Sequence, residues 1–452
     1  MNFVEDALVK RYAASLPRYT SYPTANHFSS TVGDADYKNW LAGLGDNVAL
    51  SLYTHIPFCD TLCWYCACTT KATRRYTPIA SYLDGLETEM HAVSQLLPRR
   101  HRVTHLHWGG GSPDILSAQD THRLGDLFNY CFDVPRGIEF AVEVDPRLMT
   151  AEKADSLVEI GVNRVSIGVQ DFEPAVQKAI GREQSFETSR HTIELLRDRG
   201  INSLNIDLVY GLPLQTESSL ARTIEQVIAL SPDRIAIFGY AHLPHRAPNQ
   251  KMIDGTTLPG PGQRYAMARR LASLLEQAGY RQVGLDHFAR PDDGLALHPL
   301  KRNFQGYTTD SADVLIGLGA SAIGRLPQGY VQNAVAVSDY SRRVEQGGLA
   351  TVRGWELTPE DRMRGFVIEQ LMCDFSFSTG SIAERFGEPA SQPLLREAGQ
   401  IVAEDRDGLI ERTDDGFRLT PKGRPFVRNF CARFDAHLNR SVAAGPQHSI
   451  SV

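Results

Sequence analysis

Short apolar runs alternate with longer amphipathic stretches between residues 49 and 238. The short runs have the continuous apolar character of strands buried in a parallel sheet; they are Ala49–Ile56, Val103–Trp108, Ile138–Val144, Arg164–Val169, Ser203–Leu208 and Arg234–Phe238. The stretches between them favour helices; they are Ile79–Leu97, Ala118–Phe132, Ala151–Ile160, Phe186–Arg199 and Glu217–Leu230. This alternation predicts an α/β fold, a partial (β/α)6 TIM-like barrel with its helices outside. Two further runs, Gln282–Asp286 and Val314–Leu318, are expected to close its side.

The two ends of the chain have a different pattern. Residues 1–48 contain Pro17–Thr24, which is too rich in proline and tyrosine for a helix and predicts an extended arm. After about residue 355 the alternation stops, and the pattern predicts helices, a hairpin that turns at Asp414–Gly416, and a last helix. The helices are Pro359–Cys373, Ile382–Phe386, Leu394–Glu404 and Pro421–Leu438, and the hairpin is Gly408–Thr420. We therefore expect an arm (1–48), a catalytic domain (49–350) and a mostly helical, winged-helix-like domain (355–452).

The composition excludes several classes of protein. With 42% hydrophobic and 22% charged residues, the 452-residue chain is typical of a globular protein. A net charge of −6 does not indicate nucleic acid binding, and no run approaches the ~20 apolar residues of a membrane span. Seven cysteines in 452 residues are too sparse for a disulfide framework, their number is odd, and no signal peptide precedes them. We therefore expect a protein of the reducing cytoplasm.

Three cysteines, Cys59, Cys63 and Cys66, form a C-x3-C-x2-C array directly after the first predicted strand, and Cys68 follows. Thiolates are the ligands that iron–sulfur clusters require. Three thiolates on a four-iron cluster leave one iron open to another ligand. Structural zinc would need a second ligand pair well downstream. The array therefore favours a [4Fe-4S] cluster over a zinc knuckle or buried thiols.

Polar residues follow the predicted strands at their carboxyl ends, where parallel α/β folds bind ligands. A triple glycine, residues 109–111, follows the second strand and allows a close backbone approach. Glu143, Gln170 and Asp207 stand at the ends of the next three strands, and Arg182 can pair with a carboxylate. Such a set suits a zwitterion that carries a ribose.

Longer segments resemble one family. The cysteine array resembles the radical S-adenosylmethionine (SAM) signature, and the fuller sequence resembles the oxygen-independent coproporphyrinogen III oxidases (dehydrogenases) of that superfamily. The segments that carry the resemblance cover nearly the whole chain; they are Pro17–Ala25, Tyr53–Cys59, Cys68, His107–Gly111, Glu143–Pro146, Gly168–Phe172, Asn205–Leu208, Tyr240–Pro244, Asp286–Asp293, Arg302–Thr309 and Leu419–Phe434.

The resemblance implies roles for individual residues. Cys59, Cys63 and Cys66 would hold the cluster, Cys68 would not be a ligand, and SAM would chelate the open iron. One or two SAM molecules would bind. The implied SAM contacts are Tyr53, Gly110, Gly111, Ser112, Glu143, Gln170, Arg182, Asp207, Ala241 and Ile323. Ser112 stands where the family usually has threonine, and Asp114 adds a carboxylate that departs from the family pattern.

The implied reaction begins when the reduced cluster donates an electron to SAM. The resulting 5′-deoxyadenosyl radical would take hydrogen from a propionate of coproporphyrinogen III. Two oxidative decarboxylations would give the two vinyl groups of protoporphyrinogen IX in haem biosynthesis. Candidate substrate residues are Arg18, Tyr19, Tyr22, Cys68, Arg290, Arg302, Gln305 and Tyr307. We also expect an electron donor of flavodoxin or ferredoxin type and a monomer. A radical enzyme for another tetrapyrrole and a haem-trafficking protein stay open as alternatives.

Overall fold

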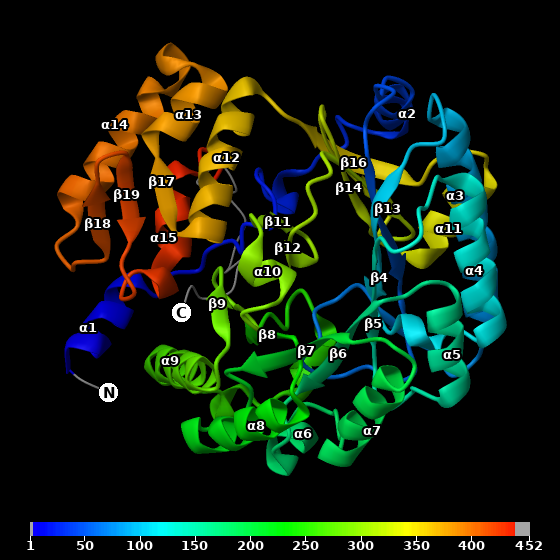
Figure 1. The fold of residues 1–452 in the computed structure, drawn as a ribbon, viewed down its shortest axis with the longest axis horizontal. Coiled ribbons are helices and arrows are strands. Elements are labelled where there is room, and N and C mark those ends of the chain that lie inside the picture. The colour runs from blue at the N-terminus through cyan, green and yellow to red at the C-terminus, as the bar shows by residue number, and fades with distance from the viewer. Residues whose placement is uncertain (1–2, 439–452) are drawn as a thin grey trace.

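The computed structural model describes residues 3–438, whose largest element is a twelve-stranded sheet. The strands lie in the order β16-β15-β14-β13-β1-β4-β5-β6-β7-β8-β10-β9. The middle of the sheet is parallel from β13 to β8. Its six main strands are β1 (Leu50–Ile56), β4 (Val103–Gly110), β5 (Glu139–Val144), β6 (Arg164–Gln170), β7 (Ser203–Tyr210) and β8 (Arg234–Gly239). They form an open arc (Figure 1).

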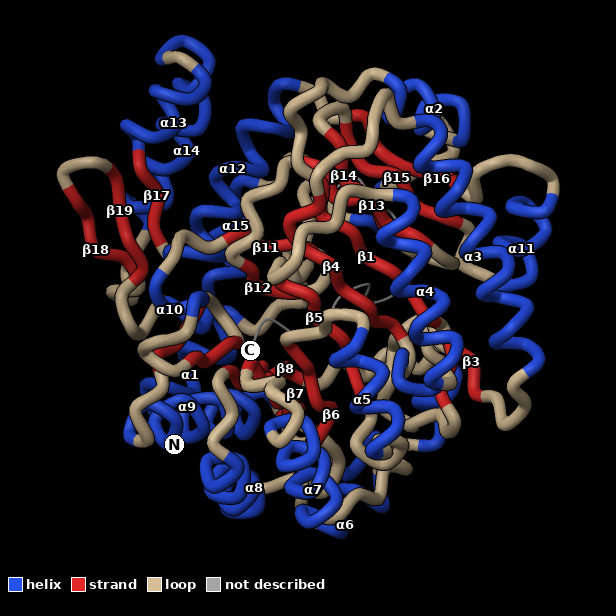
Figure 2. The backbone as a smooth tube through the Cα atoms, turned by 45° about the vertical axis from the view of Figure 1, so that its right-hand side comes forward, coloured by secondary structure: helices blue, strands red, loops and turns tan. Residues whose placement is uncertain are grey.

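Helices cover the outer face of this arc, as Figure 2 shows. They are α3 (Thr77–Leu96), α4 (Ala118–Cys131), α5 (Ala151–Glu159), α6 (Pro174–Ala179), α7 (Phe186–Arg197), α8 (Glu217–Leu230) and α9 (Pro261–Gln277). A Ser or Thr hydroxyl accepts the N–H three residues on at the start of α4, α5, α7 and α8, which satisfies a donor that a helix start leaves open. The predicted partial (β/α)6 barrel is confirmed, with boundaries shifted by one or two residues.

The two further strands that the sequence predicted extend the barrel sheet on opposite sides. They do not pair with each other, so they do not close the barrel. β13 (Val314–Leu318) pairs with β1 and leads into β14 (Ile323–Leu326), β15 (Gly329–Asn333) and β16 (Thr351–Glu356). At the other edge β10 (His287–Ala289) pairs with β8, and β9 (Arg281–Val283) pairs with β10. The expectation of closure was wrong because an apolar run specifies a strand but not its partner.

Smaller elements complete this part of the fold. They are the short strands β2 (Phe58–Cys59) and β3 (Lys71–Ala72), the helices α10 (Gly294–Leu297) and α11 (Val337–Glu345), and the hairpin strands β11 (Lys301–Asn303) and β12 (Gly306–Thr308). Within residues 3–438, no helix is long and apolar enough to cross a membrane.

The C-terminal region has its own apolar core and a three-stranded sheet in the order β17-β19-β18. Its elements are α12 (Pro359–Asp374), β17 (Ser376–Ser378), α13 (Thr379–Phe386), α14 (Glu388–Glu404), β18 (Ile410–Thr413), β19 (Gly416–Leu419) and α15 (Val427–Phe434). The hairpin is as predicted. The last helix is shorter than predicted and begins after Pro425, because proline cannot donate a hydrogen bond within a helix.

The N-terminal arm packs on this C-terminal core. Two helices that the sequence did not predict, α1 (Phe3–Tyr12) and α2 (Asp34–Ala42), flank the non-helical segment Pro17–Thr24. Tyr19 donates to Asp435 at 3.1 Å, and the Tyr22 hydroxyl accepts the N–H of Ala436 at 3.0 Å. Both tyrosine rings are buried, so the first and last described parts of the chain are joined.

Asp361 ties the barrel sheet to the C-terminal region. Its carboxylate accepts from His437 at 2.7 Å, from the Trp355 indole at 3.1 Å and from Thr358 at the start of α12. Burial alone would raise the pKa of Asp361, but these donors hold it below its usual range. The carboxylate form is therefore the one that stabilises the fold.

We expect Asp361→Ala to lower the free energy of unfolding at pH 7 by about 3 kcal/mol, because buried donors lose their acceptor. Urea unfolding followed by circular dichroism measures this. The difference should narrow below about pH 4, where Asp361 of the unfolded chain takes up a proton, and should vanish at the lower pH where the folded carboxyl is also protonated. Exposed Glu345→Ala is the control. An equal cost at pH 7 and pH 3 would contradict the role of the charge.

Candidate active site

The cysteine loop follows β1 and is closed at its base. β2 pairs with β3 in parallel, so the two ends of the loop that holds Cys59, Cys63 and Cys66 lie side by side. Cys63 is buried, Cys59 and Cys66 are half-buried, and Cys68 is exposed. The loop lies at the carboxyl end of the parallel strands, where the sequence predicted the site.

Two adjacent amides hold the backbone of this loop. Asn249 Nδ2 donates to the carbonyl oxygens of Cys63, Trp64 and Cys66 at 3.0, 3.2 and 2.8 Å. Gln250, which is fully buried, donates to the Tyr65 carbonyl at 2.8 Å and to Ala241 at 3.1 Å. Sequence reasoning missed both residues, because an Asn-Gln pair in a loop carries no recognisable motif.

Each of the three cysteine sulfurs has a hydrogen-bond donor beside it. The Ser112 hydroxyl lies 3.6 Å from Cys59 Sγ, Arg182 NH1 lies 3.5 Å from Cys63 Sγ, and the Cys68 N–H lies 3.4 Å from Cys66 Sγ. Such donors stabilise the thiolates that ligate a cluster.

The pKa values of these thiols differ. The hydrogen bond from the Cys68 thiol lowers the pKa of Cys66 to about 7, while burial raises the pKa of Cys59 to about 12. No three His, Cys, Asp or Glu side chains among residues 3–438 surround a single ion position.

Glu143 at the end of β5 is held by its neighbours. It accepts from His107 at 3.2 Å and from the Gly110 N–H at 3.1 Å. Burial would raise the pKa of Glu143, but the bond from His107 brings it below its usual range. The carboxylate is thus charged and ready to accept from an ammonium or a hydroxyl group.

The glycines after β4 make room for protein groups. Gly110 has a φ of 109°, and a Cβ there would lie 2.4 Å from the His55 ring. A Cβ on Gly111 would lie 2.3 Å from the Phe58 carbonyl oxygen. The sequence predicted that the glycine backbone approaches another group closely. In the structure that group is the segment from His55 to Phe58, so the loop after β4 packs against the segment that leads to the cysteines.

The ends of β6 and β7 contribute Gln170 and Asp207. Gln170 has a φ of 71°, where the register of β6 against β7 shifts; such backbone strain gathers at functional sites. Asp207 accepts from Ser166 and Asn205, each at 2.8 Å. Burial, with Glu143 nearby, raises the pKa of Asp207 to about 6.

Arg182 connects the cysteine loop with two strands. It donates to Asp145 at 3.0 Å and to the Gly168 carbonyl at 2.6 Å, besides its contact with Cys63. Its Nε is buried and has no hydrogen-bond partner within the described chain. A buried unpaired donor is costly, so this atom fits a ligand carboxylate.

Asp145 is shared by a second guanidinium, that of Arg147. Arg147 binds Asp145 at 2.6 Å and comes within 3.9 Å of Cys63 Sγ. Both oxygens of Asp114 accept the Asp145 N–H at 3.2 Å. Burial and the nearby Asp145 raise the pKa of Asp114 to about 7. Asp114 therefore supports the backbone of Asp145.

The other predicted SAM contacts also lie at this end. The Tyr53 hydroxyl is 3.0 Å from His55 Nδ1. Tyr53 pairs in the sheet with Gly317 of β13, and a Cβ on Gly317 would meet the backbone of Ile323 at 2.6 Å. Ala241 follows β8 and is held by Gln250. The predicted residues thus come from neighbouring strands of one curved sheet.

The candidate substrate residues are less concentrated. Arg18 reaches the Gly239 carbonyl at 2.6 Å, next to the end of β8. Tyr19, Tyr22, Arg302 and Tyr307 are buried against the C-terminal region, and Gln305 lies in the β11–β12 turn. The Arg302 guanidinium stacks 4.3 Å over the Tyr307 ring. The structure does not bring Arg290 to the cysteines, because its N–H bonds Asp233, just before β8 begins.

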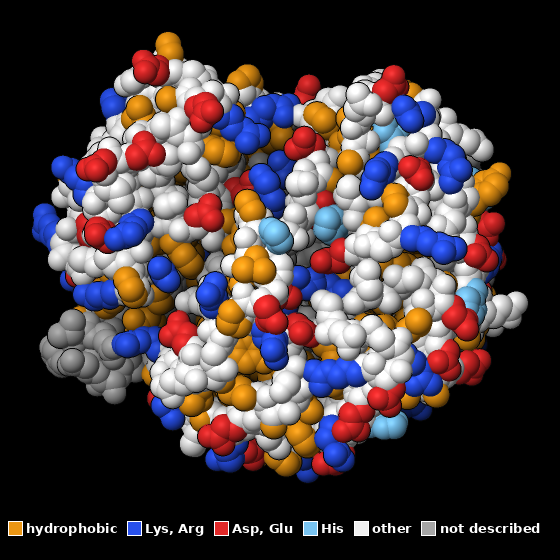
Figure 3. All heavy atoms as spheres, viewed as in Figure 1, with side chains coloured by type: hydrophobic (Ala, Val, Ile, Leu, Met, Phe, Trp, Pro, Cys, Tyr) orange, Lys and Arg blue, Asp and Glu red, His pale blue; other side chains and the backbone are white. Residues whose placement is uncertain are grey.

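The surface is hollowed between α12 and strands β13 and β14, with Lys and Arg side chains at its rim (Figure 3). This hollow has a volume of about 370 Å³ and includes Tyr19, Tyr22 and Arg302. Three of the candidate substrate residues therefore line one surface depression, apart from the cysteine loop.

Comparison with known proteins decides the family. Residues 53–227 match the radical SAM superfamily model, and residues 357–426 match the HemN C-terminal domain. The oxygen-independent coproporphyrinogen III oxidases of Bradyrhizobium diazoefficiens and Paracoccus denitrificans are 45% and 43% identical, over 94% of this chain and 95% of theirs. The chain belongs to the oxygen-independent coproporphyrinogen III oxidase family. Radical SAM membership implies a [4Fe-4S] cluster and SAM, and the donors around the cysteines and Arg182 fit both.

A solved structure agrees with this family assignment. Coproporphyrinogen III oxidase (HemN) from Escherichia coli, a radical SAM enzyme, is 39% identical and has a TM-score of 0.89. The match covers 96% of this chain and 98% of that one. The arrangement of the barrel, the arm and the C-terminal region is therefore shared with that enzyme.

We expect Cys66→Ala and Cys68→Ala to separate cluster binding from later steps. Cys66→Ala should lose the cluster, because one of three thiolates is gone. Cys68→Ala should keep it: the variant loses the thiol hydrogen bond to Cys66, but all three ligand thiols remain and the backbone N–H of residue 68 still reaches Cys66. Iron and sulfide analysis after anaerobic reconstitution measures both. A full cluster in Cys66→Ala would contradict the ligand assignment.

Asn249→Asp should loosen the cluster. The added carboxylate would face three carbonyl oxygens that the amide now binds, so the loop loses its support. We expect iron loss to a chelator, followed by absorbance, to be at least tenfold faster, with Asn249→Ala intermediate. Exposed Asn202→Ala is the control. Wild-type stability of the cluster in Asn249→Asp would refute this positioning role.

Proposed function

We propose that this protein oxidatively decarboxylates two propionates of coproporphyrinogen III to vinyl groups without oxygen, giving protoporphyrinogen IX in haem biosynthesis. The observation that carries the proposal is the cysteine loop, held against the strand-end carboxylates, in a chain 45% identical to a named coproporphyrinogen III oxidase. Bound together, the cluster and SAM supply the one-electron chemistry that removes hydrogen from the substrate.

Each residue of the site has a proposed task. Cys59, Cys63 and Cys66 hold the cluster. The unpaired Nε of Arg182 receives the carboxylate of SAM. Glu143 accepts a hydrogen bond from its amino group, and Asp207 accepts one from a ribose hydroxyl. The remaining proposed contacts, which shape the walls, are Tyr53, Gly110, Gly111, Ser112, Gln170, Ala241 and Ile323.

The substrate enters from the side of the arm. Arg18 is the candidate that lies beside the end of β8, and a hollow of about 370 Å³ there includes Tyr65, Ala67 and Ala241. The Arg18 guanidinium suits a substrate propionate that does not react. Cys68, exposed at the rim of the loop, is the proposed residue between cluster and substrate.

We propose an electron donor of flavodoxin or ferredoxin type, a monomeric state and a cytoplasmic location. The three regions 1–48, 49–350 and 355–452 are proposed as arm, catalytic domain and cover. The packing of Tyr19 and Tyr22 on Asp435 and Ala436 supports a joint role of arm and cover.

The test is anaerobic turnover of the reconstituted protein with SAM, a reductant and coproporphyrinogen III. We expect 5′-deoxyadenosine and a divinyl porphyrinogen to form together, with about two SAM consumed per product, and chromatography measures both. The Cys66→Ala variant is the control. Tight haem binding without SAM cleavage would overturn the proposal and favour a haem carrier.

A further inference from the structure

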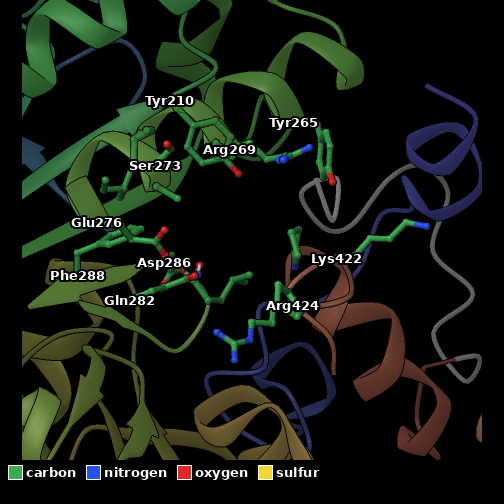
Figure 4. Close-up of a pocket in the computed structure, with 18 of the residues that line it drawn as sticks. Tyr210, Tyr265, Arg269, Ser273, Glu276, Gln282, Asp286, Phe288, Lys422 and Arg424 are labelled. Carbon is green, nitrogen blue, oxygen red and sulfur yellow. Dashed lines mark hydrogen bonds between the residues drawn. The ribbon is translucent and has the colours of Figure 1, made fainter. Parts of the chain in front are cut away.

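A cavity of about 640 Å³ lies between helix α9 of the barrel and the C-terminal region. Figure 4 shows Tyr265, Arg269 and Ser273 of α9 on one side and Lys422 and Arg424 across from them. The segment around β9 and β10 forms a third wall. Of the residues that line this cavity, the catalytic role proposed above uses Arg18 alone.

The walls of this cavity carry excess positive charge. They include five cations and two carboxylates, which are Arg18, Arg269, Lys422, Arg424, Arg428, Glu276 and Asp286. Asp286 already faces His287 at 2.8 Å and Arg302 at 3.9 Å. Burial and the neighbouring Arg18 lower the pKa of Arg428 to about 9. A cation that is destabilised in this way is stabilised when an anion arrives.

Between the cations the walls are apolar and aromatic. Ile237, Leu271 and Phe288 line the cavity together with the rings of Tyr210 and Tyr265. The volume lies in the range of pockets that hold ligands of drug size, roughly 300–1,000 Å³. Such walls suit a large, mostly apolar ring system more than a sugar or a bare phosphate.

Arg424 has an unused donor at this place. Its Nε is buried and has no hydrogen-bond partner among residues 3–438, while its guanidinium lies 5.2 Å over the Phe375 ring. Stacking fixes the plane of the guanidinium but satisfies no N–H. A carboxylate in the cavity would supply the missing acceptor.

We propose that this cavity is a second ligand site, for a ring of tetrapyrrole size that carries two or more carboxylates. The choice of ligand class rests on the proposed function, whose substrate and product are tetrapyrrole carboxylates. The cations and the apolar walls are independent of that function.

The second site is connected with the active site through Arg18. Arg18 and Gly239 line both this cavity and the hollow that contains Tyr65, Ala67 and Ala241. Arg18 now donates to the Gly239 carbonyl at 2.6 Å. A carboxylate in the cavity competes with that carbonyl for the guanidinium, so its binding alters a wall of the active site.

The experiment measures binding of mesoporphyrin IX, a stable porphyrin dicarboxylate, to the reconstituted protein by fluorescence. Arg424→Gln removes a cation, and Ser273→Trp fills the cavity; each should weaken binding at least tenfold. Arg412→Gln, exposed on β18, should leave it unchanged. Melting temperatures check that the variants fold. Cavity variants that both bind within twofold of wild type would overturn the second site, and displacement by ATP would overturn its ligand class.

Turnover of coproporphyrinogen III on the same preparations separates the two proposals. Porphyrin binding that depends on the cavity, without turnover, contradicts the proposed function and leaves the second site supported. Turnover without cavity-dependent binding contradicts the second site alone.

Discussion

The buried ion pair between Asp145 and Arg182 is the interaction on which the site depends. The two groups are 3.0 Å apart, and both side chains are about 7% exposed. The pair joins the residue after β5 to the loop that follows α6, and Arg182 also reaches Cys63 and the Gly168 carbonyl. One guanidinium thus fixes the cysteine loop relative to two strands. Removing one partner of such a pair leaves the other charge buried and unpaired, which lowers the free energy of unfolding by several kcal/mol.

Much of the fold and many of the site residues could be predicted because they follow from local rules. Apolar runs such as residues 164–169 form strands, hydroxyl residues such as Ser117 begin helices, and carboxyl ends of parallel strands meet. Hence Glu143 and Asp207 could be placed at one end of the barrel from sequence alone. The cysteine spacing added the chemistry, and the resemblance added the substrate.

The rest depends on contacts between residues far apart in the chain. Asn249 binds carbonyls 183 to 186 positions away, and no pattern announces such a contact. Arg147 and Asp114 act through Asp145, so their roles appear only when the loops are folded. The same holds for β13, whose parallel pairing with β1 extends the sheet instead of closing it. Arg290 was a reasonable candidate by charge, but chain direction places it beside the start of β8.

The central claim is that three cysteines hold a cluster whose remaining iron binds SAM. Electron–nuclear double resonance on the reduced protein, with ¹⁵N in the SAM amino group, tests it directly. The account predicts a nitrogen coupling to the cluster in the wild type and its loss in Cys66→Ala. A cluster that shows no coupling to SAM nitrogen, with a fourth protein ligand on every iron, would contradict it.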